Sequence, residues 1–427
     1  MPNFLIVRGD LRSHTGYSKA LRALLRLLEP HFDFIGGVDI HFSASKSTAE
    51  FPYHLVADHQ IMELISRGGS GRTLILHFTT PDGFVPFRGA HNVGYFFWET
   101  DRFRPDLFWT EAIRTMDEMW VPSRFMFNLL RNHGYSGPMT VITWPHDFSA
   151  PLTGELPATL QVQFVVRSSR SGAESNLTSE LHRLGDLARE YSPIYLSILT
   201  DAPRKGLPML LAGWAEYLRN RQTKSLLLLK LSSVDIARPD YQLRDEILDS
   251  LSSLVHPAVR DLDVALLFGS VSDATISGLY ALSDAYLTAT MGEGFGGPVI
   301  ESILHGKPFL SPRHTSLEDL IPPDYPFILA SEETSVILPG NVPVYSLSSR
   351  WHVVSPNAIT DALLRFDETS AEERLRAVST ARSFAARFCS KDHVAKAISE
   401  AMAHQLSIKL REDKAKIPVG SLGAQSA

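Results

Sequence analysis

The sequence predicts two doubly wound α/β domains, each a mostly parallel sheet with helices on both faces. Its 427 residues exceed the roughly 250–300 residues that one hydrophobic core usually serves. Short apolar runs alternate with amphipathic helical patterns along most of the chain, which is typical of strand–helix–strand units. This alternation stops near residue 148 and resumes near residue 193. The chain is therefore expected to divide between these positions.

The first domain is expected over residues 1–148. Helical patterns, in which apolar residues recur every three or four positions, cover 17–29, 104–116 and 123–134. Short apolar runs predict strands before, between and after them, at 3–7, 32–40, 73–78, 92–97, 118–123 and 139–143. Ser123 is a suitable N-cap for the third helix, and Gly134 lies just past its end.

The second domain is expected over residues 193–390, after a linker or insertion at 149–192 that is rich in Pro, Gly and Ser. A closing helix is predicted over 391–410 and a disordered tail over 411–427. Two such domains leave a cleft that faces the carboxyl ends of their strands, where folds of this class bind ligands. Strands of the second domain are predicted at 194–200, 225–231, 264–270, 285–290 and 308–312, with helices at 206–220 and 274–284.

Composition limits the classes of function. The formal net charge of −6 gives no electrostatic reason to expect a nucleic-acid partner. The single cysteine, Cys389, excludes an intramolecular disulfide and a cysteine-rich metal site, and fits a reducing compartment. The opening MPNFLIVRGD lacks the features of a signal peptide, and the apolar run SLLLLKL is too short to cross a bilayer. We expect a cytoplasmic protein, and a peripheral contact with the inner face of a membrane stays open.

The stretch TATMGEGFGGPVIESILHGKPFLSP, residues 288–312, has the residue types of a ligand site. Pro298 suits the first turn of a helix, and the glycines before it let the backbone approach a ligand closely. Free N–H groups at a helix start attract phosphate, and Glu301 would tilt back toward the loop that holds Glu293. These features are typical of a mouth for a sugar diphosphate. A plain helix start, with Glu301 near the positive helix end, explains them equally well.

The run EGFGGPVIE at 293–301, followed by SILHGKP, resembles the signature of retaining GT-B glycosyltransferases. This group includes glycogen and sucrose synthases and bacterial mannosyltransferases, and is the family-four-like branch. The resemblance implies the GT-B fold, in which two Rossmann-like domains face each other across a cleft. It assigns Glu293 to the donor sugar's hydroxyls near the reacting carbon and Glu301 to the nucleotide ribose. The backbone between them would approach the donor at Gly294, Phe295 and Gly296.

Two upstream segments extend the resemblance. LFGSVSDATISGLYALSDAYLTAT is similar to the family's nucleotide-side strand and helix, where backbone around Ser270 and Val271 would meet the base. DAPRKGLPMLLAGWAEY is similar to the family's R/K-K-G segment, so Lys205 would bind the diphosphate. The family often has a G-R dipeptide before that lysine, but this chain has SILT there, which leaves Arg204 as the nearest second cation. The pair Arg204 and Lys205 is otherwise explained as a solvated turn.

The N-terminal half resembles the family more weakly. RGDLRSHTGYSKALRALL is similar to its first strand–loop–helix, with Gly16 at the helix start close to the donor phosphates. Many relatives have a sugar-binding histidine where this chain has Glu99, after the strand VGYFFWE. Glu99 either takes over a sugar contact or is a structural acid that pairs with Arg102 or Arg104. His77, at the end of a predicted strand, either lies in the cleft or is a satisfied structural histidine.

The resemblance implies a metal-independent, retaining hexosyltransferase. It would move a sugar from a nucleoside-diphosphate sugar to an acceptor hydroxyl, with no cofactor besides that donor. The acceptor would be a glycan, lipid-linked molecule or protein, in bacterial polysaccharide or glycoconjugate synthesis. No Asp-x-Asp in a suitable context and no paired histidine spacing indicates a metal site. The alternatives are a catalytically inactive nucleotide-sugar-binding partner in a glycan-assembly complex, and a phosphorylase or epimerase on the same fold.

Overall fold

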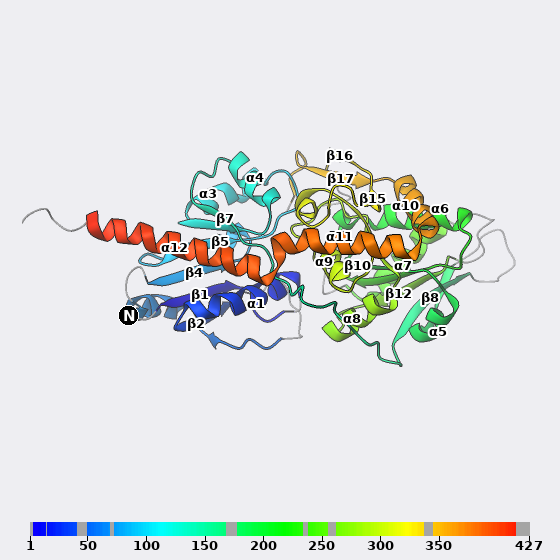
Figure 1. Ribbon diagram of the computed structural model, residues 1–427, viewed down its shortest axis with the longest axis horizontal. Coiled ribbons are helices and arrows are strands. Elements are labelled where there is room, and N and C mark those ends of the chain that lie inside the picture. The colour runs from blue at the N-terminus through cyan, green and yellow to red at the C-terminus, as the bar shows by residue number, and fades with distance from the viewer. Residues whose placement is uncertain are drawn as a thin grey trace, which may run out of the picture.

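The structure confirms an α/β fold with two large sheets that follow one another along the long axis of the molecule (Figure 1). The computed structural model describes residues 3–13, 15–40, 49–68, 72–167, 177–233, 238–254, 262–336 and 345–415. In the last helix the side chains are described as far as residue 403.

The N-terminal sheet has seven parallel strands in the order β3-β2-β1-β4-β5-β6-β7. The strands are β1 (Phe4–Gly9), β2 (Phe34–Asp39), β3 (His54–Leu55), β4 (Thr73–Phe78), β5 (His91–Tyr95), β6 (Glu118–Val121) and β7 (Met139–Val141). The helices are α1 (Gly16–Leu28), α2 (Ile61–Gly68), α3 (Trp109–Arg114) and α4 (Arg124–Asn132). Single 3-10 turns are η1 (Glu29–His31), η2 (Asp58–Gln60), η3 (Pro81–Gly83) and η4 (Pro105–Leu107).

Two helices of this domain begin where local sequence places them. Thr15 caps α1, because its Oγ1 accepts a hydrogen bond from Ser18 N at 3.3 Å. Ser123 caps α4 in the same way and accepts from Met126 N at 3.2 Å, which confirms the predicted N-cap. The apolar face predicted for α1 is fully buried at Leu21, Leu24, Leu25 and Leu28.

The C-terminal sheet has eight strands in the order β15-β14-β13-β10-β11-β12-β8-β9, and the first six of this order run parallel. Its strands are β8 (Gln161–Arg167), β9 (Leu177–Arg183), β10 (Ile194–Thr200), β11 (Leu226–Ser232), β12 (Val264–Phe268), β13 (Ala285–Leu287), β14 (Phe309–Pro312) and β15 (Ile328–Leu329). A separate antiparallel pair is formed by β16 (Ser331–Ser335) and β17 (Arg350–Val354).

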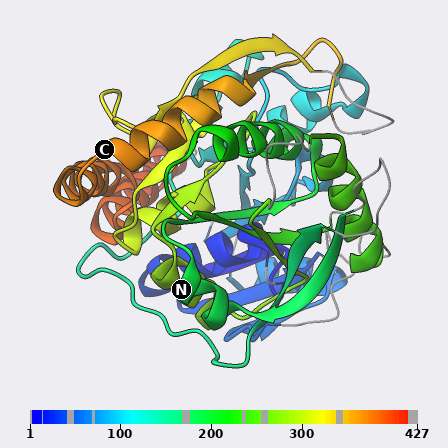
Figure 2. The same cartoon turned by 90° about the vertical axis from the view of Figure 1, so that its right-hand side faces the viewer.

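Helices cover both faces of the C-terminal sheet. In Figure 2, which looks onto this domain, α10 in orange packs beside α6 in green. The helices are α5 (Leu184–Glu190), α6 (Leu207–Asn220), α7 (Asp240–Leu254), α8 (Asp273–Leu282), α9 (Gly297–Leu304), α10 (Pro356–Glu368), α11 (Ala371–Cys389) and α12 (Lys391–Ala415). The 3-10 turns are η5 (Pro203–Lys205) and η6 (Thr315–Asp319).

Residues 149–192 differ from the linker or insertion that the sequence predicted. β8 and β9 form an antiparallel hairpin, and β8 pairs with β12, so this part of the chain widens the C-terminal sheet. α5 follows directly. The inward residues Val162 and Phe164 alternate with polar ones, as in a half-buried strand. The sequence on both sides of this strand is rich in Pro, Gly and Ser, which favoured the prediction of a linker over that of a strand.

The last two helices connect the domains. α11 packs against α9 of the C-terminal domain, whereas α12 packs against α1 and β7 of the N-terminal domain (Figure 1). The two crossings of the chain lie side by side, since His146 N donates to Cys389 O at 2.7 Å and Lys391 N donates to His146 O at 3.0 Å. α12 runs past residue 410, where the closing helix was expected to end. Residues 416–427 of the predicted tail lie outside the described residues.

Candidate active site

The strand orders locate a site before any side chain is considered. Both sheets contain the order 3-2-1-4-5-6 of doubly wound folds, so the loops diverge between β1 and β4 and between β10 and β13. Ligands bind at such switch points, outside the carboxyl ends of the strands. In the C-terminal domain the loop after β10 carries Arg204 and Lys205, and the loop after β13 carries Glu293. The sheet therefore brings together residues that are 88 positions apart.

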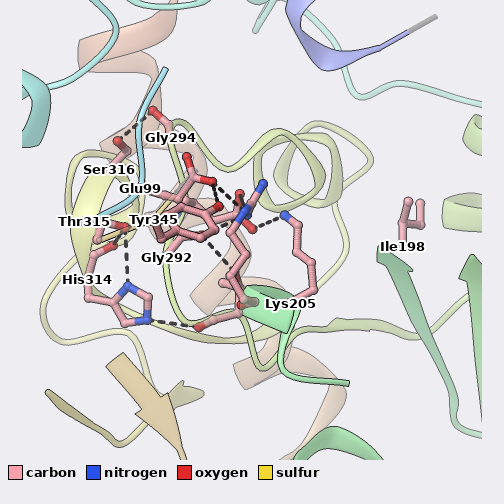
Figure 3. A network of polar contacts seen from close by, with 12 residues as sticks. Glu99, Ile198, Lys205, Gly292, Gly294, His314, Thr315, Ser316 and Tyr345 are labelled. Atoms are coloured by element: carbon pink, nitrogen blue, oxygen red, sulfur yellow. Dashed lines mark hydrogen bonds and ion pairs between the residues drawn. The ribbon is translucent and has the colours of Figure 1, made fainter. Parts of the chain in front are cut away.

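Lys205 and Glu293 form a close ion pair at this switch point (Figure 3). Lys205 Nζ lies 2.5 Å from Glu293 Oε1, and both side chains are only about one-tenth exposed, at 12% and 11%. Arg204 Nη1 lies 3.5 Å from the other carboxylate oxygen and donates to Gly292 O at 3.0 Å. The predicted catalytic residues are thus brought into one cluster.

The residue directly after the two cations, Gly206, lies at a position that favours glycine. η5 ends in Gly206 at a φ of +67°, a left-handed conformation that favours glycine. A Cβ at Gly206 would lie 2.1 Å from Ala289 O, in the strand-to-loop segment that leads to Glu293. Arg204 O accepts from Met291 N at 2.6 Å. The tight backbone contact between the two loops holds the side chains in register.

Glu99 joins this cluster from the N-terminal domain. Its Oε1 lies 2.7 Å from Arg204 Nε, and it also accepts a hydrogen bond from the Tyr345 hydroxyl (Figure 3). Pairing with Arg102 or Arg104, one of the two alternatives for Glu99, is not what the structure has, because those side chains pair with the neighbouring Asp101 and Asp106. Glu99 lies instead where two domains and the Arg204 guanidinium meet.

In this cluster, burial and the neighbouring opposite charges shift the pKa values of Glu293, Lys205 and Arg204 in opposite directions. Burial alone would raise the pKa of Glu293, but Lys205 and then Arg204 outweigh it and hold that pKa below its usual value. Burial, and then Arg204, lowers the pKa of Lys205, while Glu293 opposes this shift. Burial lowers and Glu99 raises the pKa of Arg204, with a net rise. Two carboxylates and two cations therefore form a buried cluster without net charge.

Glycines let the N-terminal domain lie directly on the glutamate motif. A Cβ at Gly292 would lie 2.3 Å from Glu99 O, and a Cβ at Gly294 would lie 2.7 Å from Phe97 Cβ. The segment around Phe97 therefore fits against these glycines. Tyr17 holds this segment in place, because its hydroxyl accepts from Phe97 N at 2.9 Å and donates to Phe97 O at 3.2 Å. Gly294, expected to face the donor, thus makes room for the other domain.

Further contacts tie the domains together in this structure. Ser123 Oγ and Ser316 Oγ are 2.8 Å apart, and Arg124 Nε lies 2.6 Å from Asp319 Oδ1. Ser316 Oγ in turn donates to Gly294 O at 2.8 Å (Figure 3). These bonds run from the start of α4 to η6 and close the domain interface beside the cluster.

The pKa of Glu301 is shifted by a different set of neighbouring charges. Burial raises the pKa of its carboxyl, and Asp273 adds to the rise, while Lys19 and Lys230 oppose it. Lys19 of α1 forms an ion pair with Asp273 at the start of α8, with a distance of 2.6 Å between Nζ and Oδ1. Different charges therefore act on the two motif glutamates: Glu293 pairs with the cations after β10, whereas the pKa of Glu301 is shifted by charges on α1, α8 and β11 without a direct ion pair among the described residues.

The other predicted contacts with the nucleotide lie on the Glu301 side. Gly16 begins α1, and a Cβ there would meet no atom within 4 Å, so the space beside it is open. Ser270 is exposed and Val271 is partly buried, in the turn between β12 and α8. Gly296 caps α9 at a φ of +102°, and its carbonyl accepts from the backbone of Val299.

Two predicted site residues, His77 and Phe295, lie neither in the cluster nor beside Glu301. His77 is fully buried: its Nδ1 lies 3.2 Å from Arg8 Nη1 and its Nε2 lies 3.3 Å from Asn92 Oδ1. Burial lowers the pKa of His77 to about 4, and the polar contacts of both ring nitrogens favour the structural alternative. Phe295 is 6% exposed and packs against Trp144 and His146 at the chain crossing, rather than against the site.

Thr315 and His314 support the backbone of the cluster but were not among the predicted site residues. Thr315 Oγ1 accepts from Glu293 N at 3.0 Å, and His314 Nε2 lies 3.1 Å from Thr290 O. The run HTS, one residue after the predicted strand PFLSP, was a usable signal, because such residues often bond to backbone in loops. Tyr345 had no comparable signal. Among the described residues no group of three or more His, Cys, Asp or Glu side chains could hold a metal ion.

Tyr345→Phe is expected to lower the free energy of unfolding by about 1.5–3 kcal/mol, the usual value of a hydrogen bond to a charged group. Its hydroxyl donates to the largely buried Glu99, which would lose that partner without gaining water. The matched control is Tyr53→Phe, since Tyr53 donates to Glu29 at an exposed position. Urea unfolding of both variants checks this. Equal effects would show that the Tyr345 bond carries no special weight.

Comparison with solved structures identifies the fold. The chain is similar to HepE of Anabaena in complex with UDP and glucose, with 13% identity, a TM-score of 0.59, and 94% of this chain and 99% of that chain covered. It is similar to the sucrose-phosphate synthase of Thermosynechococcus elongatus, with 14% identity, a TM-score of 0.62, and 95% and 100% covered. It is also similar to a UDP-forming α,α-trehalose-phosphate synthase of Burkholderia xenovorans in complex with glucose-6-phosphate, with 10% identity, a TM-score of 0.56, and 94% and 100% covered.

The sequence matches no protein-family model and no curated protein. Within the described residues no helix is both long and apolar enough to cross a membrane. The structural likeness covers nearly the whole of each chain, and at this identity it concerns the fold. The chain has the GT-B fold: two Rossmann-like domains that face each other at the carboxyl ends of their strands.

Proposed function

We propose that this protein transfers a sugar from a nucleoside-diphosphate sugar to an acceptor hydroxyl, with retention at the anomeric carbon. The observation that carries the proposal is the buried pair of Lys205 and Glu293, 2.5 Å apart at the switch point of a GT-B fold. The motif at 293–301, which resembles that of family-four-like retaining enzymes, supports it.

The residues of the site suit this chemistry. The leaving diphosphate gains negative charge in the transition state, and a fixed cation in a water-poor site stabilises such charge. Lys205 and Arg204 supply it, so the reaction needs no metal ion. Glu293 accepts hydrogen bonds from sugar hydroxyls, and Glu301 accepts them from the ribose. The contacts between the domains keep water from the donor, which limits hydrolysis.

The donor is proposed to be a UDP-sugar in the first instance. HepE is seen with UDP and glucose, and the trehalose-phosphate synthase is UDP-forming, which supports that choice. The acceptor is proposed to be a glycan, a lipid-linked molecule or a protein in bacterial polysaccharide or glycoconjugate synthesis. The proposed location is the cytoplasm, including the inner membrane face.

A second candidate is a nucleotide-sugar-binding partner that does not catalyse. One observation favours it: the cations of the cluster are already engaged by the protein's own carboxylates, Arg204 by Glu99 and Lys205 by Glu293. A donor has to displace part of these contacts before Lys205 can meet a phosphate.

Donor turnover separates the two candidates. Purified protein is incubated with UDP-, GDP-, ADP- and dTDP-sugars in the presence of EDTA, and free nucleoside diphosphate and melting temperature are measured. We expect slow diphosphate release from one donor, lost in Glu293→Gln and unchanged in the control Glu332→Gln, an exposed glutamate on β16. A melting shift without release from any donor, with or without acceptors, would favour the binding partner. The absence of any shift would contradict both.

A further inference from the structure

Lys230 is a buried cation on one of the inner strands of the C-terminal sheet. It lies on β11 and is 8% exposed, in a sheet whose neighbouring residues Leu229 and Leu231 are fully buried. Its ammonium makes no hydrogen bond and no ion pair with any residue that the structure describes. A buried ammonium is unfavourable unless it is paired, so a lysine at this position needs a reason.

The position of Lys230 relates it to the candidate active site. Lys230 pairs in register with Ile198 of β10, the strand that leads into the loop with Lys205. The carboxyl ends of β10 and β11 lie at the same edge of the sheet, which is the edge that faces the N-terminal domain. Lys230 therefore lies one strand away from Lys205, on the ligand-binding edge.

The charges around Lys230 come from both domains. Burial lowers its pKa, Lys19 of α1 lowers it further, and Glu301 and Asp240 oppose the shift. Lys19 is held in place by its ion pair with Asp273 at 2.6 Å. Two ammonium groups, one from each domain, thus act on the same space beside Glu301. Charges of one sign at a cleft raise the local concentration of ions of the opposite sign.

We propose that Lys230 binds a phosphate oxygen of the nucleoside-diphosphate donor, and so supplies a positive charge that the segment SILT lacks. This inference rests on the proposed function. Arg204 and Lys205 are already engaged by Glu99 and Glu293, whereas no hydrogen bond or ion pair with a described residue has to be broken at Lys230. Lys230 would thus bind the phosphate from a strand, whereas the second cation of the resembled family lies in the loop before the lysine.

Lys230→Met tests the inference, because methionine keeps most of the buried volume and removes the charge. We expect the variant's melting temperature without ligand to be equal to or above that of the wild type, since an unpaired buried charge is removed. We expect its affinity for UDP, measured by calorimetry on the full chain, to fall at least about tenfold. Affinity for uridine, which has no phosphate, should not change.

Lys224→Met is the matched control, since Lys224 stands just before the same strand but is exposed beside Glu190. It should leave the affinity for UDP unchanged. Wild-type affinity for UDP in Lys230→Met would overturn the inference while leaving the proposed function standing, as would a fall in melting temperature without a change in affinity. If the wild type binds none of UDP, GDP, ADP and dTDP, the proposed function fails, and the inference fails with it.

Discussion

Lys205→Met and Glu293→Gln are each expected to lower the free energy of unfolding by about 3–5 kcal/mol, because each leaves an uncompensated buried charge. The cluster of Lys205, Arg204, Glu293 and Glu99 has no net charge as it stands. The double variant removes one charge of each sign and is expected to recover most of the lost stability. Denaturant unfolding of the wild type, the two single variants and the double variant checks this as a double-mutant cycle.

Sugar transfer should respond to these substitutions differently from stability. If Lys205 and Glu293 contact the donor, each single variant loses at least tenfold in turnover, by analogy with the loss of one charge-stabilising donor, about 10²–10³. The double variant stays inactive although it is stable. Stability losses that simply add in the double variant would show that the two side chains are not coupled. Recovery of turnover with stability would mean that the pair is structural.

Gly292→Ala is expected to lower turnover by about a hundredfold, the effect of a shift of about 1 Å in an active site. A Cβ at Gly292 would lie 2.3 Å from the backbone oxygen of Glu99, so the two domains have to move apart. The Glu99–Arg204 pair, now 2.7 Å long, would lengthen with that movement. Small-angle scattering should show a larger radius of gyration, while far-UV circular dichroism stays unchanged.

The control for this variant is Gly185→Ala. Gly185 lies in α5, has no positive φ, and a Cβ there would meet nothing within 4 Å. That change should stabilise the helix slightly and leave turnover unchanged. Wild-type turnover in Gly292→Ala would show that contact between Glu99 and the glutamate motif plays no part in the reaction.

Much of the fold was predictable because its signals are local. Apolar runs and periodic leucines predicted the main strands and helices, and Ser123 predicted the start of α4. The α/β class follows from their alternation. The hairpin of β8 and β9 was missed because its strands lie among turn-forming residues, and antiparallel pairing to β12 leaves no trace in local sequence.

Within the site, the residues close to one another in the chain were again predictable. The run at 293–301 and the turn before Gly206 are recognisable because local backbone geometry requires their residue types. They contain glycines at positive φ, a proline in a first helical turn, and cations at a loop end. These requirements act over a few residues, so the sequence alone was enough to place Glu293 and Lys205 in loops of the correct kind.

The partners of those residues required the three-dimensional structure. Glu99 faces Arg204 rather than Arg102, His77 is enclosed in the core, and Lys230 is buried without a bond to any residue that the structure describes, although all three are ordinary polar residues in the sequence. Ion pairing and burial depend on which residues from distant parts of the chain meet, and no periodicity records that. The sequence thus determined the elements and the motif, while the packing of two domains decided which charges meet at their interface.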